Sequence, residues 1–293
     1  MILEDFLSNW LRVYVAPKRA KSTLQGYRQA LAHLSDAVKK TEIDQVDPMT
    51  LQEEINALSA DYSRQAQILF VALNQAMKRA QKLGLIQSNP MQLCEKPGHE
   101  TEEAEVLTPE EATAYIREAM GHRCGPLLIL MLCLGLRRNE ARALKKSSLT
   151  PEGVLLIRQQ RKGNDLAPLK TKSSRREIPV PEGLRSFFEQ AEGEYLVDCS
   201  ENGLRRAHLA VLAACGIDRK ITLHGLRHSC ATMAINHGLP LPWIQWLLGH
   251  KHSSTTADFY LHRNLAALTS ATGLIYHYFA DPSNGVGARL EIV

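Results

Sequence analysis

The sequence contains no apolar run long enough to cross a membrane. The longest such run, residues 126–136, falls well short of the roughly 18 residues that a spanning helix needs. The N-terminal residues carry acidic side chains and no basic start, so we expect neither a secretion signal nor a membrane partner. Low-complexity segments and internal repeats are also absent. With 44% hydrophobic and 23% charged residues in 293, the composition is typical of a folded soluble protein with one large or two ordinary domains. We expect it in the cytoplasm, because its cysteines are typical of reduced thiols.

The six cysteines form none of the patterns that bind metal or build a disulfide framework. They are scattered without a C-x-x-C pair, which is typical of reduced thiols. His224 and His228 are four residues apart, but no glutamate lies between them as in an H-E-x-x-H zinc site. The sequence also lacks a paired-carboxylate cluster of the kind that binds Mg²⁺, which disfavours a metal-dependent nuclease. We therefore expect no metal and no cofactor.

The net charge of +4 is modest, but it is unevenly distributed. Residues 1–97 hold 12 Lys and Arg against 10 Asp and Glu, whereas residues 98–111 hold six Glu and no basic residue. Residues 112–293 hold 23 Lys and Arg against 15 Asp and Glu. The C-terminal part is therefore the basic one, which suits a polyanionic partner such as DNA.

The first third of the chain is predicted to be helical. Ser22 and Thr23 can cap a helix with one apolar stripe, formed by Leu24, Tyr27, Leu31, Leu34 and Val38. Two further helices are predicted over residues 50–58 and 63–83, the second ended by Gly84. Residues 1–97 are thus expected to form one helical domain, and the glutamate-rich residues 98–107 a solvated linker.

Residues 108–293 are expected to form a second, mainly α-helical domain with a small antiparallel β-sheet. Residues 108–111 have a capping threonine, a proline and two acids, which is typical of a helix start. Residues 127–134 are predicted to be a buried helix. Residues 154–160 and 176–180 are short apolar or β-branched runs, and they are predicted to be strands.

Four short segments of this second domain combine arginine, lysine, histidine and tyrosine in an unusual way. They are residues 135–140, 170–176, 224–228, and 248–250 with 260–262. Planar guanidinium groups bind the oxygens of a phosphodiester bidentately, and clustered positive charge helps a tyrosine to lose its proton and become a nucleophile. Together the segments therefore indicate phosphoryl transfer on a nucleic acid.

In order and spacing these segments resemble the tyrosine recombinases, the phage integrase family of site-specific DNA recombinases, over essentially the whole chain. The helical N-terminal unit similarly resembles the core-site DNA-binding (SAM-like) domain of that family. The family's motifs are matched by G-x-R-x-x-E at Gly135, Arg137 and Glu140, by Lys170 ahead of R-x-I-P at 176–179, by H-x-x-R at His224 and Arg227, and by L-G-H with Y-x-H at His250, Tyr260 and His262.

The resemblance implies how the phosphate is held. Arg137 and Arg227 would clamp the scissile phosphate, His250 would donate a further hydrogen bond, and Glu140 would hold Arg137. Further DNA contacts are expected from Arg138, Arg175 and Arg176 of the same segments and from Lys162.

The resemblance also implies the covalent chemistry. Tyr260 would attack to give a 3′-phosphotyrosine link, His224 would act in proton transfer near it, and Lys170 would protonate the departing 5′ oxygen. Lys172 is the alternative to Lys170, because alternation along a strand puts both side chains on the same face.

The expected partners are double-stranded DNA with specific recombination sites and further copies of this chain. A monomer or dimer would assemble on two duplexes as a tetramer. Residues 288–293 alternate apolar and charged, so we expect the tail 286–293 to dock on a neighbouring subunit, with a frayed terminus as the alternative. Two alternatives stay open: a non-catalytic DNA-binding protein of the same fold, and a DNA-relaxing enzyme resembling type IB topoisomerases.

Overall fold

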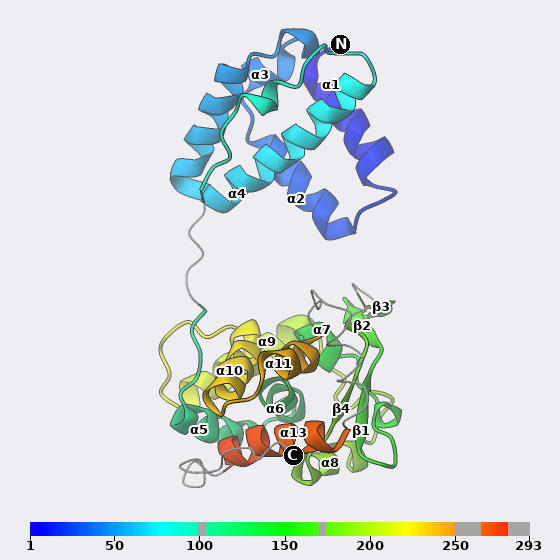
Figure 1. Ribbon diagram of the computed structural model, residues 1–293, viewed down its shortest axis with the longest axis vertical. Coiled ribbons are helices and arrows are strands. Elements are labelled where there is room, and N and C mark those ends of the chain that lie inside the picture. The colour runs from blue at the N-terminus through cyan, green and yellow to red at the C-terminus, as the bar shows by residue number, and fades with distance from the viewer. Residues whose placement is uncertain (99–103, 170–173, 250–264, 281–293) are drawn as a thin grey trace. The chain divides into compact units, whose positions relative to one another are not determined.

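The computed structural model describes residues 1–98, 104–169, 174–249 and 265–280, and the chain divides into two compact units, Met1–Glu102 and Glu103–Val293 (Figure 1). Each unit has its own hydrophobic core. The fold is mainly helical with short antiparallel strands, as the sequence predicts. Within the described residues, no helix is long and apolar enough to cross a bilayer. All six cysteines are free thiols.

The first unit consists of helices and turns wherever it is described. Ser35 interrupts the helix predicted through Val38, because its hydroxyl accepts from the Val38 amide and starts a new helix. The predicted capping by Ser22 and Thr23 is also wrong, since Ala20 takes the cap position without a side-chain bond. The elements are α1 (Leu3–Trp10), η1 (Leu11–Val15), α2 (Lys21–Ala32), α3 (Asp36–Lys40), η2 (Ile43–Gln45), α4 (Pro48–Lys82) and η3 (Pro90–Gln92).

The long helix α4 unites the two helices predicted over 50–58 and 63–83. Its backbone leaves the helical region at Tyr62, with φ −136° and ψ 61°, so the two halves meet at a kink. Asp47 caps its start by accepting from the Thr50 amide at 2.8 Å. Gly84 follows its end with φ +71°, the left-handed conformation that terminates helices, as predicted.

The second unit is arranged around α6, whose residues 127–134 are all fully buried. A helix that is apolar on every side has to be surrounded, and α5, α10 and α13 pack around it (Figure 1). The predicted capping box at Thr108 and Glu111 starts α5. The helices are α5 (Pro109–Met120), α6 (Gly125–Leu134), α7 (Arg138–Ala141), η4 (Lys146–Ser148), α8 (Glu182–Glu189), α9 (Glu201–Ala214), α10 (Leu223–Asn236), α11 (Leu241–Leu248) and α13 (Leu265–Ala280).

Four short strands in the described part of the chain form two antiparallel pairs. The first pair joins β1 (Val154–Ile157) to β4 (Arg176–Pro179), with Ile157 opposite Arg176. The second is the hairpin of β2 (Gln159–Lys162) and β3 (Asp165–Pro168), which the sequence prediction missed. Both lie on one side of the unit (Figure 1).

The last described helix, α13, runs through Gly273 without interruption. A single glycine lowers helix stability by only about 1 kcal/mol, and burial of Leu268, Ala271 and Ile275 offsets that cost. The tail 286–293 lies outside the described residues.

Residues 104–107, at the end of the expected linker, are docked on the second unit. Leu107 is fully buried, and its amide donates to the Ser229 hydroxyl of α10 at 2.9 Å. The Arg219 guanidinium binds the Val106 carbonyl at 2.9 Å and pairs with Glu105 and Glu111. This end of the linker is therefore part of the unit that follows it.

Gly135 ends α6 at a place where only glycine fits. Its φ is +61°, and a β-carbon there would lie 2.5 Å from Cδ2 of Leu248. We expect Gly135→Ala to lower the free energy of unfolding by about 2–4 kcal/mol, from left-handed strain plus overpacking. Gly216→Ala is the matched control, because Gly216 has φ +69° with nothing within 4 Å, and should cost only about 1 kcal/mol. If urea unfolding showed equal losses of stability for the two variants, the close contact between residue 135 and Leu248 would be contradicted.

Candidate active site

Arg137 is placed by the tight turn between α6 and α7. Gly135 reverses the chain after α6, Leu136 is buried, and Arg137 takes the cap position of α7. The Arg137 amide donates to Oε2 of Glu140 at 3.0 Å, and its Nη1 donates to Oε1 of the same carboxylate at 2.8 Å. One glutamate thus fixes both the backbone and the side chain of Arg137.

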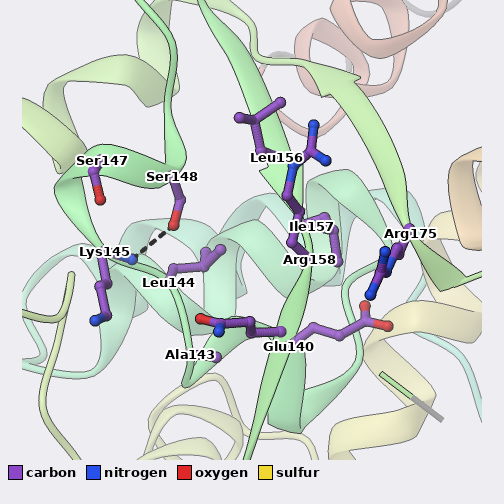
Figure 2. A pocket seen from close by; sticks show the side chains of 11 residues that line it. Glu140, Ala143, Leu144, Lys145, Ser147, Ser148, Leu156, Ile157, Arg158 and Arg175 are labelled. Carbon is purple, nitrogen blue, oxygen red and sulfur yellow. Dashed lines mark hydrogen bonds between the residues drawn. The ribbon is translucent and has the colours of Figure 1, made fainter. Parts of the chain in front are cut away.

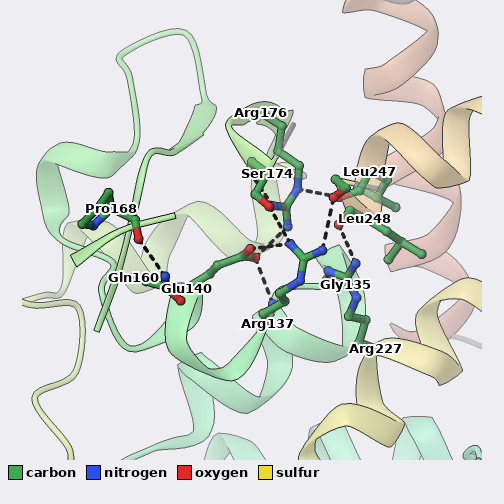
Figure 3. Close-up of polar contacts among 11 residues, drawn as sticks. Gly135, Arg137, Glu140, Gln160, Pro168, Ser174, Arg176, Arg227, Leu247 and Leu248 are labelled. Carbon is green, nitrogen blue, oxygen red and sulfur yellow. Dashed lines mark hydrogen bonds and ion pairs between the residues drawn. The ribbon is translucent and has the colours of Figure 1, made fainter. Parts of the chain in front are cut away.

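Three arginines from different elements bind three successive carbonyls at the end of α11. Nε of Arg176 donates to the Leu247 carbonyl at 2.7 Å, Arg227 donates to that of Leu248, and Nη2 of Arg137 donates to that of Gly249 at 3.1 Å (Figure 3). The last carbonyls of a helix have no partners within it and carry partial negative charge, which attracts cations. The end of α11 therefore gathers the guanidinium groups at one point.

Glu140 is the carboxylate of this cluster. It is 2% exposed, and it pairs with Arg137 at 2.8 Å and with Arg176 at 2.9 Å (Figure 3). Burial alone would raise the pKa of Glu140, but attraction by Arg176 and hydrogen bonds from Arg176 and Arg137 outweigh it and lower that pKa. Glu140 is therefore ionised at neutral pH and holds both arginines.

The cluster carries more positive than negative charge. Arg227 is 3% exposed and donates to the Gly135 carbonyl at 2.7 Å, with no carboxylate paired to it among the described residues. Burial first, and then repulsion by Arg137 and Arg176, lowers the pKa of Arg227 to about 9. All three guanidinium groups are still charged at neutral pH, against one carboxylate. An anion such as a phosphate would relieve this repulsion.

A cavity of about 500 Å³ opens beside Arg137. His224, at the start of α10, lines it together with Arg137, and the His224 ring meets that of His228 edge to face, with ring centroids 4.7 Å apart. The basic residues Arg138, Arg205 and Lys220 line the same cavity. Two of the predicted catalytic side chains therefore face one basic hollow.

His208 is a wall residue of this cavity that the sequence did not single out. It is 1% exposed, and its ring nitrogens bond to the Tyr115 hydroxyl at 2.7 Å and the Ile221 carbonyl at 2.9 Å. Burial lowers the pKa of His208, so the ring is neutral and can accept from Tyr115 while donating to Ile221. It thereby supports the chain just before His224. No motif in the sequence signals this role.

The expected DNA-binding residues divide into exposed and buried ones. Arg138, Lys162 and Arg175 are exposed, and Arg138 pairs with Glu201 at 2.8 Å. Arg176 is buried, with its guanidinium bound to Glu140 and to backbone carbonyls. In this structure Arg176 therefore supports the cluster from inside, and its contact with DNA stays a prediction.

Arg175 lines a second cavity, of about 390 Å³, that Glu140 also lines. Lys145 and Arg158 also line it, and the Lys145 amide donates to the Ser148 hydroxyl at 3.0 Å (Figure 2). Arg175, just before β4, and Arg176, its first residue, thus face opposite ways, one into this basic hollow and the other into the core.

The remaining predicted catalytic residues fall outside the described part of the chain. They are Lys170, its alternative Lys172, His250 and Tyr260, and the motif residue His262 lies outside it as well. The described chain reaches Leu169 just before the first lysine, and Gly249, whose carbonyl binds Arg137, just before His250.

Comparison with known proteins finds the same family along most of the chain. Residues 105–266 match the model of the phage integrase family, and residues 2–59 match that of the phage integrase N-terminal SAM-like domain. A tyrosine recombinase XerC-like protein of Caldanaerobacter subterraneus subsp. tengcongensis is 27% identical, with 89% of this chain and 79% of that protein covered.

Two solved structures share the fold. The Tn1549 transposon integrase in complex with transposon right end DNA matches with a TM-score of 0.73 and 18% identity, over 91% of this chain and all of that one. A lambda integrase tetramer bound to a Holliday junction matches with a TM-score of 0.71 and 17% identity, over 87% of this chain and 79% of that one.

Glu140→Gln tests the charge balance of the cluster. Removing the shared carboxylate leaves three guanidinium groups unbalanced, so we expect the free energy of unfolding at pH 7 to fall by about 3 kcal/mol. A carboxyl whose folded pKa is lowered stabilises the fold above its ordinary pKa, and that contribution disappears as the pH falls through the folded pKa. The difference between wild type and variant should therefore be constant from about pH 6 to 8 and shrink below about pH 4.5.

The matched control is Glu201→Gln, which removes the exposed partner of Arg138. An exposed ion pair contributes at most about 1 kcal/mol, so this variant should unfold close to wild type. Urea unfolding of wild type and both variants at several pH values measures these differences in stability. If Glu140→Gln were as stable as the control at pH 7, the carboxylate would not balance the arginines.

Proposed function

The chain belongs to the phage integrase family of tyrosine recombinases, enzymes that cleave and rejoin DNA at specific sites, and we propose that the three-arginine cluster at the end of α11 is where it binds the scissile phosphate. The observation that carries this proposal is the charge of the cluster, with three guanidinium groups against one carboxylate among the described residues. Arg137 is half-exposed beside the basic cavity, whereas Arg227 is buried.

Arg137 and Arg227 would clamp the two non-bridging oxygens of the phosphate. Each guanidinium has five N–H donors, and the bonds within the protein use only some of them. Negative charge grows on these oxygens in the transition state, so fixed positive groups lower the barrier. His250 follows Gly249 directly and would donate a further hydrogen bond. Arg176 would act only through Glu140 and the carbonyl of Leu247.

The covalent step would use Tyr260. Its phenolic oxygen attacks phosphorus, a phosphorus–oxygen bond to tyrosine forms, and the bond from phosphorus to the 5′ oxygen breaks. The tyrosine proton passes toward His224, and Lys170 or Lys172 gives a proton to the departing oxygen. The 3′-phosphotyrosine link keeps the energy of the broken bond, so a free 5′ hydroxyl can reverse the attack without ATP or a metal ion.

The proposed partners are duplex DNA with specific sites and further copies of this chain. The helical first unit would hold the DNA, which its match to the SAM-like family domain supports. A tetramer on two duplexes is proposed because strand exchange joins two sites, and the lambda integrase of the same fold forms a tetramer on a Holliday junction.

The nucleophile can be tested with nicked duplexes that trap the covalent intermediate. We expect wild type to form a denaturant-resistant adduct in excess EDTA, because arginine and lysine take the roles that a cation would play. Tyr260→Phe should bind the same DNA with unchanged affinity and form no adduct. A normal adduct yield from Tyr260→Phe would remove the assignment, and a strict Mg²⁺ requirement would remove the proposed chemistry.

The proton donor can be tested with a substrate whose bridging 5′ oxygen is replaced by sulfur, which leaves without a proton. We expect Lys170→Ala to cleave ordinary DNA about 10²- to 10⁴-fold more slowly than wild type and to cleave the sulfur substrate at nearly the wild-type rate. Lys172→Ala is the matched control and should behave alike on both substrates. The opposite result would move the role to Lys172.

Deletion of residues 286–293 tests the role of the tail. We expect binding to a single site to stay near normal and assembly of the two-duplex complex to weaken, because the tail is proposed to add a strand to a neighbouring subunit. Gel-shift assays on one and two sites measure both. Recombination of two sites at the full-length rate would show that the tail does not dock.

A further inference from the structure

Arg142 ties the β2–β3 hairpin to the segment that carries the phosphate clamp. It follows α7 directly and is 1% exposed. Its Nη2 donates to the Gly163 carbonyl in the turn of the hairpin at 2.8 Å, and its Nε donates to the Cys199 carbonyl at 3.1 Å. One side chain therefore joins α7, the hairpin and the segment before α9.

Arg161 holds the hairpin from within β2. It is 6% exposed, and its Nη1 pairs with Oδ1 of Asp198 at 2.7 Å. Its guanidinium also lies over the Tyr195 ring, 4.2 Å from the centroid. The hairpin is thus bound twice to residues 195–199, once through its turn and once through its first strand.

Residues 195–199 are in turn fixed to the body of the unit. The Leu196 amide donates to the Leu144 carbonyl at 2.8 Å, two residues after Arg142. Arg123 donates to the Asp198 carbonyl at 3.0 Å, next to the start of α6. Hydrogen bonds therefore close a ring from α7 to the hairpin, to residues 195–199 and back to α7.

Fold stability alone does not explain a buried arginine at position 142. Among the described residues no carboxylate pairs with Arg142, and its buried Nη1 has no hydrogen-bond partner. A buried charge with unsatisfied donors is costly, and an apolar side chain of similar volume often gives equal or greater stability. What an apolar side chain cannot do is bind two carbonyls of two separate elements at once, as the rigid guanidinium fork does.

We propose that Arg142, together with Arg161 and Asp198, is a positioning residue that sets the hairpin at a fixed distance from the phosphate clamp. Arg142 lies five residues after Arg137, and β3 ends at Pro168, two residues before Lys170 and four before Lys172. The inference rests on the proposed function, in which one of these lysines protonates the 5′ oxygen. Loosening the hairpin would leave the clamp in place and misplace the proton donor.

The experiment compares cleavage of ordinary DNA with cleavage of the 5′-sulfur substrate in single-turnover assays on the full chain. Arg142→Met removes both carbonyl bonds at similar volume, and Asp198→Asn weakens the hold on Arg161 at a side chain that is 69% exposed. Glu194→Gln is the matched control, because Glu194 pairs with Lys145 on the same segment, is 68% exposed and makes no bond to the hairpin.

We expect Arg142→Met to cleave ordinary DNA roughly 10- to 100-fold more slowly than wild type, because a misplacement of about 1 Å costs that much. The sulfur substrate, which needs no proton, should be cleaved within about threefold of wild type. Asp198→Asn should show the same selective loss to a smaller degree, and Glu194→Gln should show none.

Equal losses on both substrates would overturn the inference, because they would mean a general structural defect. If Arg142→Met fails to fold, Asp198→Asn tests the inference through the same comparison of its cleavage rates on ordinary DNA and on the sulfur substrate. The proposed function fails separately: in that case wild type forms no tyrosine adduct, or neither lysine variant is rescued by sulfur. Rescue of Lys172→Ala instead of Lys170→Ala leaves the inference standing, since the hairpin leads into both.

Discussion

The backbone carbonyls at the end of α11, which have no hydrogen-bond partner within the helix, hold this site together. A helix end leaves acceptors that need partners, and here three arginines from the turn after α6, from β4 and from α10 supply them. Each arginine comes from a different part of the chain, so the second unit has to be folded before they can meet. The tight turn at Gly135 also helps to hold the cluster, because the Gly135 carbonyl is the other acceptor for Arg227.

The carboxylate of Glu140, which pairs with both Arg137 and Arg176, reduces the repulsion among the three arginines without cancelling their positive charge. Full neutralisation would require two more acids, and the site would then have no attraction for a phosphate. Too little neutralisation would drive the guanidinium groups apart. With one acid the arginines stay in place and positive charge remains, so the cluster is preorganised for an anion before DNA arrives. The lowered pKa of Arg227 reflects the energetic cost of burying this positive charge beside two other arginines.

Much of the site followed from motif order, but several details depended on burial that motifs do not show. Arg176 was assigned to DNA because it sits beside Arg175 in a basic run. The strand period would have indicated that its side chain is buried, since Arg176 shares a face with Ile178, which is fully buried. The β2–β3 hairpin was missed because its strands are polar, although Gly163-Asn164 is a two-residue turn signal. The contacts of Arg142 and His208 join distant segments, and no local pattern predicts them.

The end of the linker, residues 104–107, is bonded directly to the helix that carries Arg227 and to the residues just before it. Leu107 is bonded to Ser229, two residues after Arg227 on the same helix, and Arg219 binds Val106 just before that helix begins. A displacement of residues 104–107 would therefore act on α10, and through it on Arg227 and the end of α11. The docked end of the linker and the proposed phosphate clamp are in this way joined by hydrogen bonds within the second unit.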